Sequence, residues 1–257
     1  MDALFYEMIF KRKSFHIFKG EKTLSGSELN EIEKVFYGFR PLIEGVRVAM
    51  KIVPRKETSC PRGEYCILLY SEEKDNYLQN VGYIGEQLDL WLASKNIGVC
   101  WYGLGKTDQK TYDGLSFVMM LAIEKADAGE FRKDMFKSKR KPLEEIWIGE
   151  NHGNIANIVR FAPSSCNTQP WIVESGEDKL SVYRYKKPGK RGMMPVGRVT
   201  YSNRIDIGIF LLFLEVCLAH EHIVTERTLF SDSGDADAEK TLVAEYRFEK
   251  RNGEKCR

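Results

Sequence analysis

Two long apolar segments, one in each half of the chain, most constrain how the chain can fold. The first, within residues 81–105, begins as an amphipathic helix that Gly98 ends. One face of this helix is apolar at helical spacing: Ile84, Leu88, Trp91 and Leu92. The second segment, residues 204–222, reads as a buried helix. Because strand-like segments surround both helices, we expect the α+β class, with helices packed on antiparallel sheet.

The order of the predicted elements recurs along the chain. In the first half, helices within 1–18 and 25–39 precede the long helix, and strands are predicted at 46–54, 64–71 and 115–124. In the second half, a helix at 151–161 precedes strands at 171–175 and 180–186, the long helix, and a strand at 241–250. We therefore predict two halves of similar architecture, residues 1–148 and 149–257, that form one compact unit.

The charge balance and the apolar runs argue against several classes of protein. The chain has 39 basic and 37 acidic residues, whereas a nucleic-acid-binding protein usually shows a basic excess. The longest apolar run, residues 205–218, contains Asp206 and Glu215 and is too short and too polar to span a bilayer. The first residues lack a basic region ahead of an apolar core, so we expect no secretory leader.

Cysteine and histidine spacing predicts neither a disulfide framework nor a metal site. The six cysteines form no Cys-x-x-Cys pair and have no histidine at metal-ligand spacing: Cys60, Cys66, Cys100, Cys166, Cys217 and Cys256. His220 and His222 are not four residues apart, as a helical zinc motif requires. We expect reduced cytoplasmic thiols, used mostly in packing.

Two short stretches carry residues suited to chemistry. In "KRKSFHIF", a turn can aim Arg12 and Ser14 at one anion, although a solvated basic turn would have the same sequence. In "APSSCNTQPW", hydroxyls and amides crowd together after Pro163. The amides of Asn167 and Gln169 can donate and accept at the edge of a flat heterocycle, but a capped loop between helix and strand is equally compatible with them.

Together these stretches strongly resemble the FMN-dependent nitroreductase family. Its members carry an Arg-x-Ser turn near the N-terminus and a Pro-Ser-Ser-x-Asn-x-Gln-Pro-Trp segment. "IGVCWYGLG" also resembles the loop that the family places over the flavin, and "KSKRKPLEE" resembles its basic tail. The resemblance covers most of the chain, and the serine-rich segment is its most specific motif.

The order of the motifs departs from the ordinary family. There, the serine-rich motif follows the Arg-x-Ser turn by a few tens of residues, where this chain has "EGVRVAMKIVP"; in the second half, "ENHGNI" holds the place of Arg-x-Ser. Ordinary members are dimers with FMN at the interface, and the two motifs come from different subunits. This chain therefore resembles the single-chain, duplicated branch of the family, a fused pseudo-dimer that keeps one composite site and needs no partner chain.

The resemblance implies a role for each matching residue. Arg12 and Ser14, with the adjacent Lys13, would hold the phosphate and ribityl end of FMN. His16 stands where the family usually has lysine or arginine, which predicts a lower reduction potential or pH-dependent activity. The remaining predicted cofactor contacts come from the glycine-rich loop, the basic tail and the serine-rich loop: Gly103, Leu104, Gly105, Lys106, Arg140, Pro163, Ser164, Ser165, Asn167 and Gln169.

We expect backbone N–H groups of Gly105 or Lys106 to reach flavin N5, whereas Gln169 could instead hold its own loop. The resemblance implies an oxidoreductase in which FMN takes hydride from NADH or NADPH and passes it to a nitroaromatic, a quinone or a related acceptor. No side chain is assigned as an obligate acid or base. The alternative is a non-catalytic flavin carrier or redox sensor.

Overall fold

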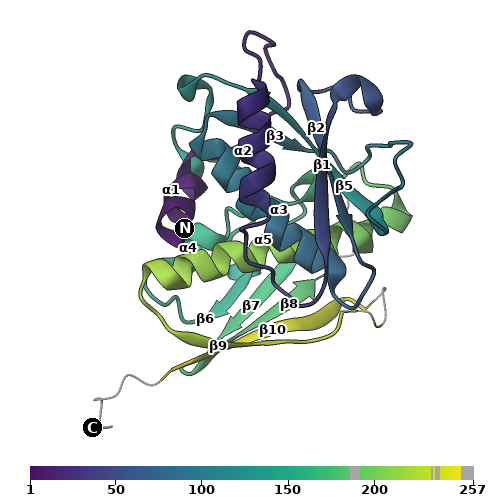
Figure 1. The fold of residues 1–257 in the computed structure, drawn as a ribbon. Helices are drawn as coiled ribbons and strands as arrows, with labels where there is room; N and C mark the ends of the chain where they lie inside the picture. Colours follow the sequence, from purple (N-terminus) through teal and green to yellow (C-terminus); the bar gives the residue numbers. More distant parts are fainter. Residues whose placement is uncertain (186–191, 233, 235–237, 250–257) are drawn as a thin grey trace.

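The first sheet lies in the first half of the chain and is antiparallel. The computed structural model describes residues 1–185, 192–232, 234 and 238–249 (Figure 1). The strand order is β1 (Val48–Pro54), β2 (Tyr65–Ser71), β5 (Leu115–Lys125) and β3 (Ile97–Trp101), and β4 (Thr111–Tyr112) also pairs with β5. Three of these strands were predicted from apolar runs. β3 lies in the stretch taken as the glycine-rich end of the first long helix.

The second sheet has the order β6 (Trp147–Gly149), β7 (Trp171–Ser175), β8 (Lys179–Tyr185), β10 (Lys240–Phe248) and β9 (Thr225–Leu229). Its pairs are antiparallel except that of β6 with β7. Sequence reasoning missed β6 and β9. β6 is only three residues long, and β9 alternates half-buried with exposed side chains and carries no apolar run. Lys186 and Lys250, the predicted ends of two strands, lie outside the described residues.

The two predicted long helices pack against each other between the sheets. α3 (Tyr77–Ser94) and α5 (Val199–His220) are almost completely buried. They cross at glycines: a Cβ on Gly82 would lie 2.0 Å from the carbonyl oxygen of Ile205, and one on Gly208 would lie 1.9 Å from that of Gln79. A side chain at either glycine would therefore force the helices apart.

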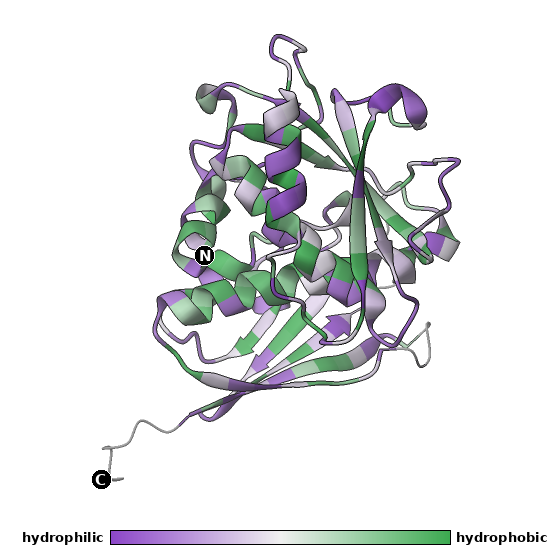
Figure 2. Ribbon diagram, viewed as in Figure 1, coloured by the Kyte–Doolittle hydropathy of each residue, from purple (hydrophilic) through white to green (hydrophobic). Residues whose placement is uncertain are grey.

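The remaining helices are short and lie at the periphery. They are α1 (Asp2–Lys11), α2 (Gly26–Phe36), α4 (Ile155–Val159) and the 3₁₀ turns Arg55–Glu57, Ala128–Glu130, Met135–Lys137, Leu143–Glu145, Ser165–Asn167 and Val196–Arg198. Ser25 caps α2 through a reciprocal pair with Glu28, as its sequence predicts. In Figure 2, α2 carries hydrophilic residues on its visible outer face, whereas hydrophobic residues dominate α5.

The predicted α+β class is confirmed. Apart from β6 and β4, the two sheets share one pattern, in which the first two strands of each half are followed by the last strand and then the third. Within the described residues, no helix is long and apolar enough to cross a membrane.

Candidate functional site

A cavity of about 550 Å³ lies between the two halves of the chain. The first half contributes the turn after α1, the end of β3 with the loop after it, the middle of β5, and the segment that follows β5. The second half contributes the serine-rich loop and the N-terminal half of α5. The volume lies within the range of roughly 300–1,000 Å³ that is typical of sites for small molecules and cofactors.

The structure brings ten of the fourteen predicted contacts together at this cavity. Its lining includes Arg12, Lys13, Ser14, His16, Gly103, Arg140, Pro163, Ser164, Ser165 and Asn167. The N–H of Phe15 donates to the carbonyl of Val99 at 2.9 Å, which fixes the N-terminal turn beside β3. Residues separated by about 150 positions in sequence thus share one wall, as the resemblance implied.

Leu104, Gly105, Lys106 and Gln169 do not line the cavity. The N–H of Gly105 donates to the Tyr102 carbonyl at 3.1 Å, and the N–H of Lys106 donates to Ser59 Oγ at 2.7 Å. Neither group is free to reach a ligand atom, which corrects the expectation that one of them faces flavin N5. A Cβ on Gly105 would instead meet the side chain of Met120 at 2.3 Å, so this glycine permits packing.

Gln169 holds the serine-rich loop in place. It is buried, its Oε1 accepts the N–H of Lys141 at 2.9 Å, and its Nε2 donates to the carbonyl of Asn167 at 3.1 Å. Ser164 Oγ accepts the Gln169 N–H at 2.9 Å. Cys166, Asn167 and Gln169 have φ values of 51°, 55° and 49°, a left-handed conformation that these hydrogen bonds stabilise.

Three arginines give the cavity a positive wall. Arg12 is buried and its Nη2 lies 2.8 Å from Asp89 Oδ2, and its Nε lies 3.4 Å from Glu86 Oε1. Burial and repulsion by neighbouring arginines lower the pKa of Arg140 to about 10, and burial with Arg12 lowers the pKa of Arg132 to about 10. The Arg132 side chain has no acidic partner in the described part of the chain. Uncompensated cations of this kind favour an anionic ligand.

His16 has a cation beside it. Nη1 of Arg62 lies 3.3 Å from His16 Nδ1 and equally 3.3 Å from Cys100 Sγ. Arg62 comes from the loop between β1 and β2, far from the Arg-x-Ser turn in sequence, so motif reasoning could not place it here. Arg62 thus adds a positive charge next to His16, although it does not itself line the cavity.

Asp206 is the main lining residue that sequence reasoning did not assign. It is buried in α5, and its Oδ1 accepts the Ser165 N–H at 2.9 Å and the Ser165 hydroxyl at 3.2 Å. Burial raises its pKa to about 7. The sequence feature that could have indicated Asp206 is the presence of a carboxylate inside the apolar run 205–218. Apolar lining comes from Trp101, Met119, Ile205 and Ile209, and Arg132 and Cys166 complete the wall.

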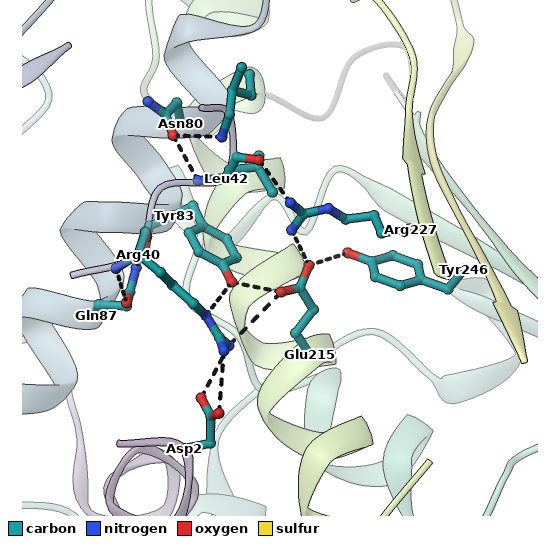
Figure 3. Close-up of polar contacts among 10 residues, drawn as sticks. Asp2, Arg40, Leu42, Asn80, Tyr83, Gln87, Glu215, Arg227 and Tyr246 are labelled. Carbon is teal, nitrogen blue, oxygen red and sulfur yellow. Dashed lines mark hydrogen bonds and ion pairs between the residues drawn. The ribbon is translucent and has the colours of Figure 1, made fainter. Parts of the chain in front are cut away.

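A different arrangement of polar side chains, beside a more open pocket of about 670 Å³, lies on the opposite side of the α3–α5 pair (Figure 3). Glu215 accepts hydrogen bonds from Tyr83 at 2.6 Å, Arg227 at 2.6 Å and Tyr246 at 2.7 Å. Arg40 donates to the Tyr83 hydroxyl at 2.8 Å and pairs with Asp2 at 3.1 Å. Every charge in this cluster has a partner, so the cluster offers no free group to an ion.

Among the described residues, no group of three or more histidine, cysteine, aspartate or glutamate side chains could hold a metal ion. The five cysteines in this part of the chain are free thiols, and Cys256 lies outside it.

Comparison with known proteins identifies relatives of this chain. No curated protein is similar enough to match it. The fold is similar to that of a putative nitroreductase from Thermotoga maritima, with a TM-score of 0.60, 16% identity, and coverage of 95% of this chain and 92% of that one. A putative nitroreductase from Desulfovibrio desulfuricans, solved in complex with FMN, is 17% identical, covers 57% of this chain and 96% of its own, and has a TM-score of 0.39.

The sequence profile of one family, described as putative TM nitroreductase, matches residues 5–217. This span includes α3, α5 as far as Cys217, both motifs and every residue of the cavity wall. The chain therefore belongs to the putative TM nitroreductase family.

Proposed function

We propose that this oxidoreductase of the nitroreductase family binds one FMN in the cavity and transfers hydride from NADH or NADPH, through the flavin, to a nitroaromatic, a quinone or a related acceptor. The observation that carries the proposal is the meeting of the Arg-x-Ser turn and the serine-rich loop on one wall with three arginines. Family membership supports FMN as the cofactor.

The cavity residues fit a flavin mononucleotide. A phosphate would lie against Arg132 and Arg140, which have no acidic partner among the described residues, with Arg12 and its two carboxylates beside them. Hydroxyls and amides of Ser14, Ser165 and Asn167 suit the ribityl chain and the ring edge. Trp101, Met119, Ile205 and Ile209 offer apolar contact to a flat ring.

When bound, FMN supplies the hydride-accepting and hydride-donating chemistry, and the protein supplies orientation and electrostatics. Asp89 contributes by orienting two cavity residues, because its Oδ2 accepts from Arg12 at 2.8 Å and from Trp101 Nε1 at 2.9 Å. Arg62, beside His16, places positive charge where a reduced, anionic ring would be stabilised.

The single site belongs to a fused pseudo-dimer in this proposal. The same number of residues separates Gln79 from Ile205, Gly82 from Gly208, and Asp89 from Glu215. Where the helices cross, Gly82 meets Ile205 and Gly208 meets Gln79. The segment Phe39–Ile43, "FRPLI", precedes β1 as "FAPSS", Phe161–Ser165, precedes β7. The place of the serine motif in the first half is therefore "PLI" and not the later "EGVRVAMKIVP", most of which enters β1.

In this proposal, the place of the second site is taken by the polar contacts drawn in Figure 3. The cluster of Arg40, Tyr83, Glu215, Arg227 and Tyr246 stands where the internal relation would place a second flavin. Since the composite site needs no second chain, we propose that the protein acts as a monomer. We also propose a cytoplasmic location, which the free thiols support.

The test is a titration with FMN, followed by absorbance and flavin fluorescence. We expect one FMN per chain, and a loss of affinity of about tenfold or more in Arg132→Ala, because a phosphate contact by a cation contributes about 1.5–3 kcal/mol. Lys133→Ala removes the same charge one residue away, at an exposed position outside the lining, and should bind FMN normally. Two FMN per chain, or none, would contradict the proposal.

Turnover is tested separately by mixing the FMN-loaded protein with NADH or NADPH without oxygen. Fast bleaching of the flavin, and parallel lines in steady-state kinetics with a quinone, are expected of hydride transfer in two half-reactions. Intersecting lines would contradict this order of steps. Tight FMN binding with negligible reduction by either nucleotide would favour the flavin carrier or redox sensor.

A further inference from the structure

Asp206 occupies an unusual position for a carboxylate. It lies in the second turn of α5, between Ile205 and Ile207, and its side chain is 1% exposed. The residue forms part of the cavity wall, yet it has no ion pair with any described residue. A buried carboxylate without a cation is costly when ionised.

The two oxygens of Asp206 have different surroundings. Oδ1 accepts both the N–H and the hydroxyl of Ser165. Oδ2 is buried and has no hydrogen-bond partner among the described residues. Because an ionised oxygen would be left unpaired there, this arrangement suits a neutral acid, with its proton on Oδ2.

Asn80, in the first half of the chain, makes contacts that can be compared with those of Asp206. Asn80 stands in α3 at the spacing that relates Gly82 to Gly208, and its Oδ1 accepts the N–H groups of Leu42 at 2.8 Å and Ile43 at 3.1 Å. Its Nδ2 donates to the Val46 carbonyl at 3.3 Å. An amide thus holds one loop with an acceptor and a donor, and a protonated acid at position 206 would present the same pair of groups.

We infer that Asp206 is a positioning residue whose proton controls ligand binding: as a neutral acid it holds Ser165 through Oδ1 and keeps Oδ2–H for an acceptor atom of the ligand. This inference rests on the proposed binding of FMN. Burial raises the pKa of Asp206 to about 7, which agrees with a proton that is lost just above neutrality. Ionisation then puts a negative charge into the wall of an anion site and weakens binding.

Other charged or titratable groups share this cavity and must be separated from Asp206. They are Arg12, Lys13, His16, Arg132, Arg140 and Cys166, with Glu86 and Asp89 behind Arg12. The arginines stay charged throughout the neutral range. The phosphate of FMN titrates near pH 6, below the range from pH 7 to 9. The other groups are the same in the wild type and in Asp206→Asn, so the difference between the two proteins isolates the carboxyl group.

The experiment compares FMN dissociation constants of the wild type and Asp206→Asn at pH 7, 8 and 9. The variant copies the Asn80 arrangement, so it should fold and hold Ser165. We expect the wild-type constant to rise by up to about tenfold per pH unit in this range, while that of the variant rises much less. Infrared spectra of the wild type should show a protonated carboxyl band that fades as the pH rises and is missing in the variant.

Equal pH dependence in both proteins, or a wild type without the infrared band at pH 6, would overturn the inference and leave FMN binding intact. If neither protein binds FMN at any pH, the proposed function fails and this inference fails with it. Burial also raises the pKa of Glu86 well above its usual range, so the infrared band is assigned to Asp206 by its loss on substitution. Asp206→Ala gives the same assignment if Asp206→Asn does not fold.

Discussion

Replacing Asp206 with asparagine is expected to make the stability of the ligand-free protein less sensitive to pH. Burial raises the pKa of Asp206 from 3.8 in the unfolded chain to about 7 in the fold. Between these values the folded protein holds a proton that the unfolded chain has released, so wild-type stability falls as the pH rises and the loss is complete above about pH 7. From pH 5 to pH 8 this loss amounts to about 2–3 kcal/mol.

Urea unfolding at pH 5 and pH 8 measures the effect as a difference between variant and wild type, in which the other titrating groups cancel. The free energy of unfolding of Asp206→Asn, relative to that of the wild type, should increase by about 2–3 kcal/mol from pH 5 to pH 8. This corresponds to roughly 5–10 °C in melting temperature for a chain of this size. Asp113→Asn makes the same chemical change at a side chain that is 71% exposed, and its difference should stay constant. A constant difference for Asp206→Asn would refute the reasoning.

Three other perturbations test the helix crossing, the hydrogen bonds around Glu215, and the charge of Arg62 beside His16. Gly208→Ala should destabilise the protein by more than about 2 kcal/mol in urea unfolding, because its Cβ would lie 1.9 Å from the Gln79 carbonyl oxygen; Gly26→Ala, with no atom within 4 Å of the new Cβ, should be near neutral. Glu215→Gln should cost about 2–4 kcal/mol in the same assay, since Arg227 loses its charged partner, and should leave FMN stoichiometry at one. Arg62→Ala should lower the midpoint potential of bound FMN, and an unchanged potential would show that this guanidinium does not act on the flavin.

The long elements were predictable because their apolar patterns are strong. Both central helices and most strands follow from runs or helical spacing of apolar residues. β9 was missed because the exposed residues Glu226 and Thr228 alternate with half-buried positions that include Arg227, a pattern typical of an edge strand but weak as a signal. The parallel pairing of β6 with β7 depends on contacts between distant segments that no local pattern encodes.

The site was predictable where one short motif supplies several side chains. The Arg-x-Ser turn and the serine-rich loop were found in this way, and ten predicted residues share the cavity. Arg132 and Asp206 were missed because each is a single charged residue outside any motif, and only the fold brings it to the wall. The N–H groups of Gly105 and Lys106 were expected to be free for a ligand, whereas they donate to Tyr102 and Ser59, and sequence alone cannot show these contacts.

In the proposed pseudo-dimer, the absence of a second flavin site is best explained by the polarity and charge of the side chains at its place. Asp89 and Glu215 have related places on α3 and α5, and each accepts from an arginine and an aromatic side chain. At the cavity, Ile209 stands where the other side has Tyr83, whose hydroxyl reaches Glu215 at 2.6 Å. Both places therefore keep an acid that organises an arginine, and a pocket of about 670 Å³ lies beside Glu215, so a lack of room does not distinguish them. Only the cavity combines serine hydroxyls with arginines that have no acidic partner among the described residues. If this is the cause, enlarging the second place by Tyr83→Ile alone will not create a flavin site, because "PLI" still supplies no serine hydroxyls there.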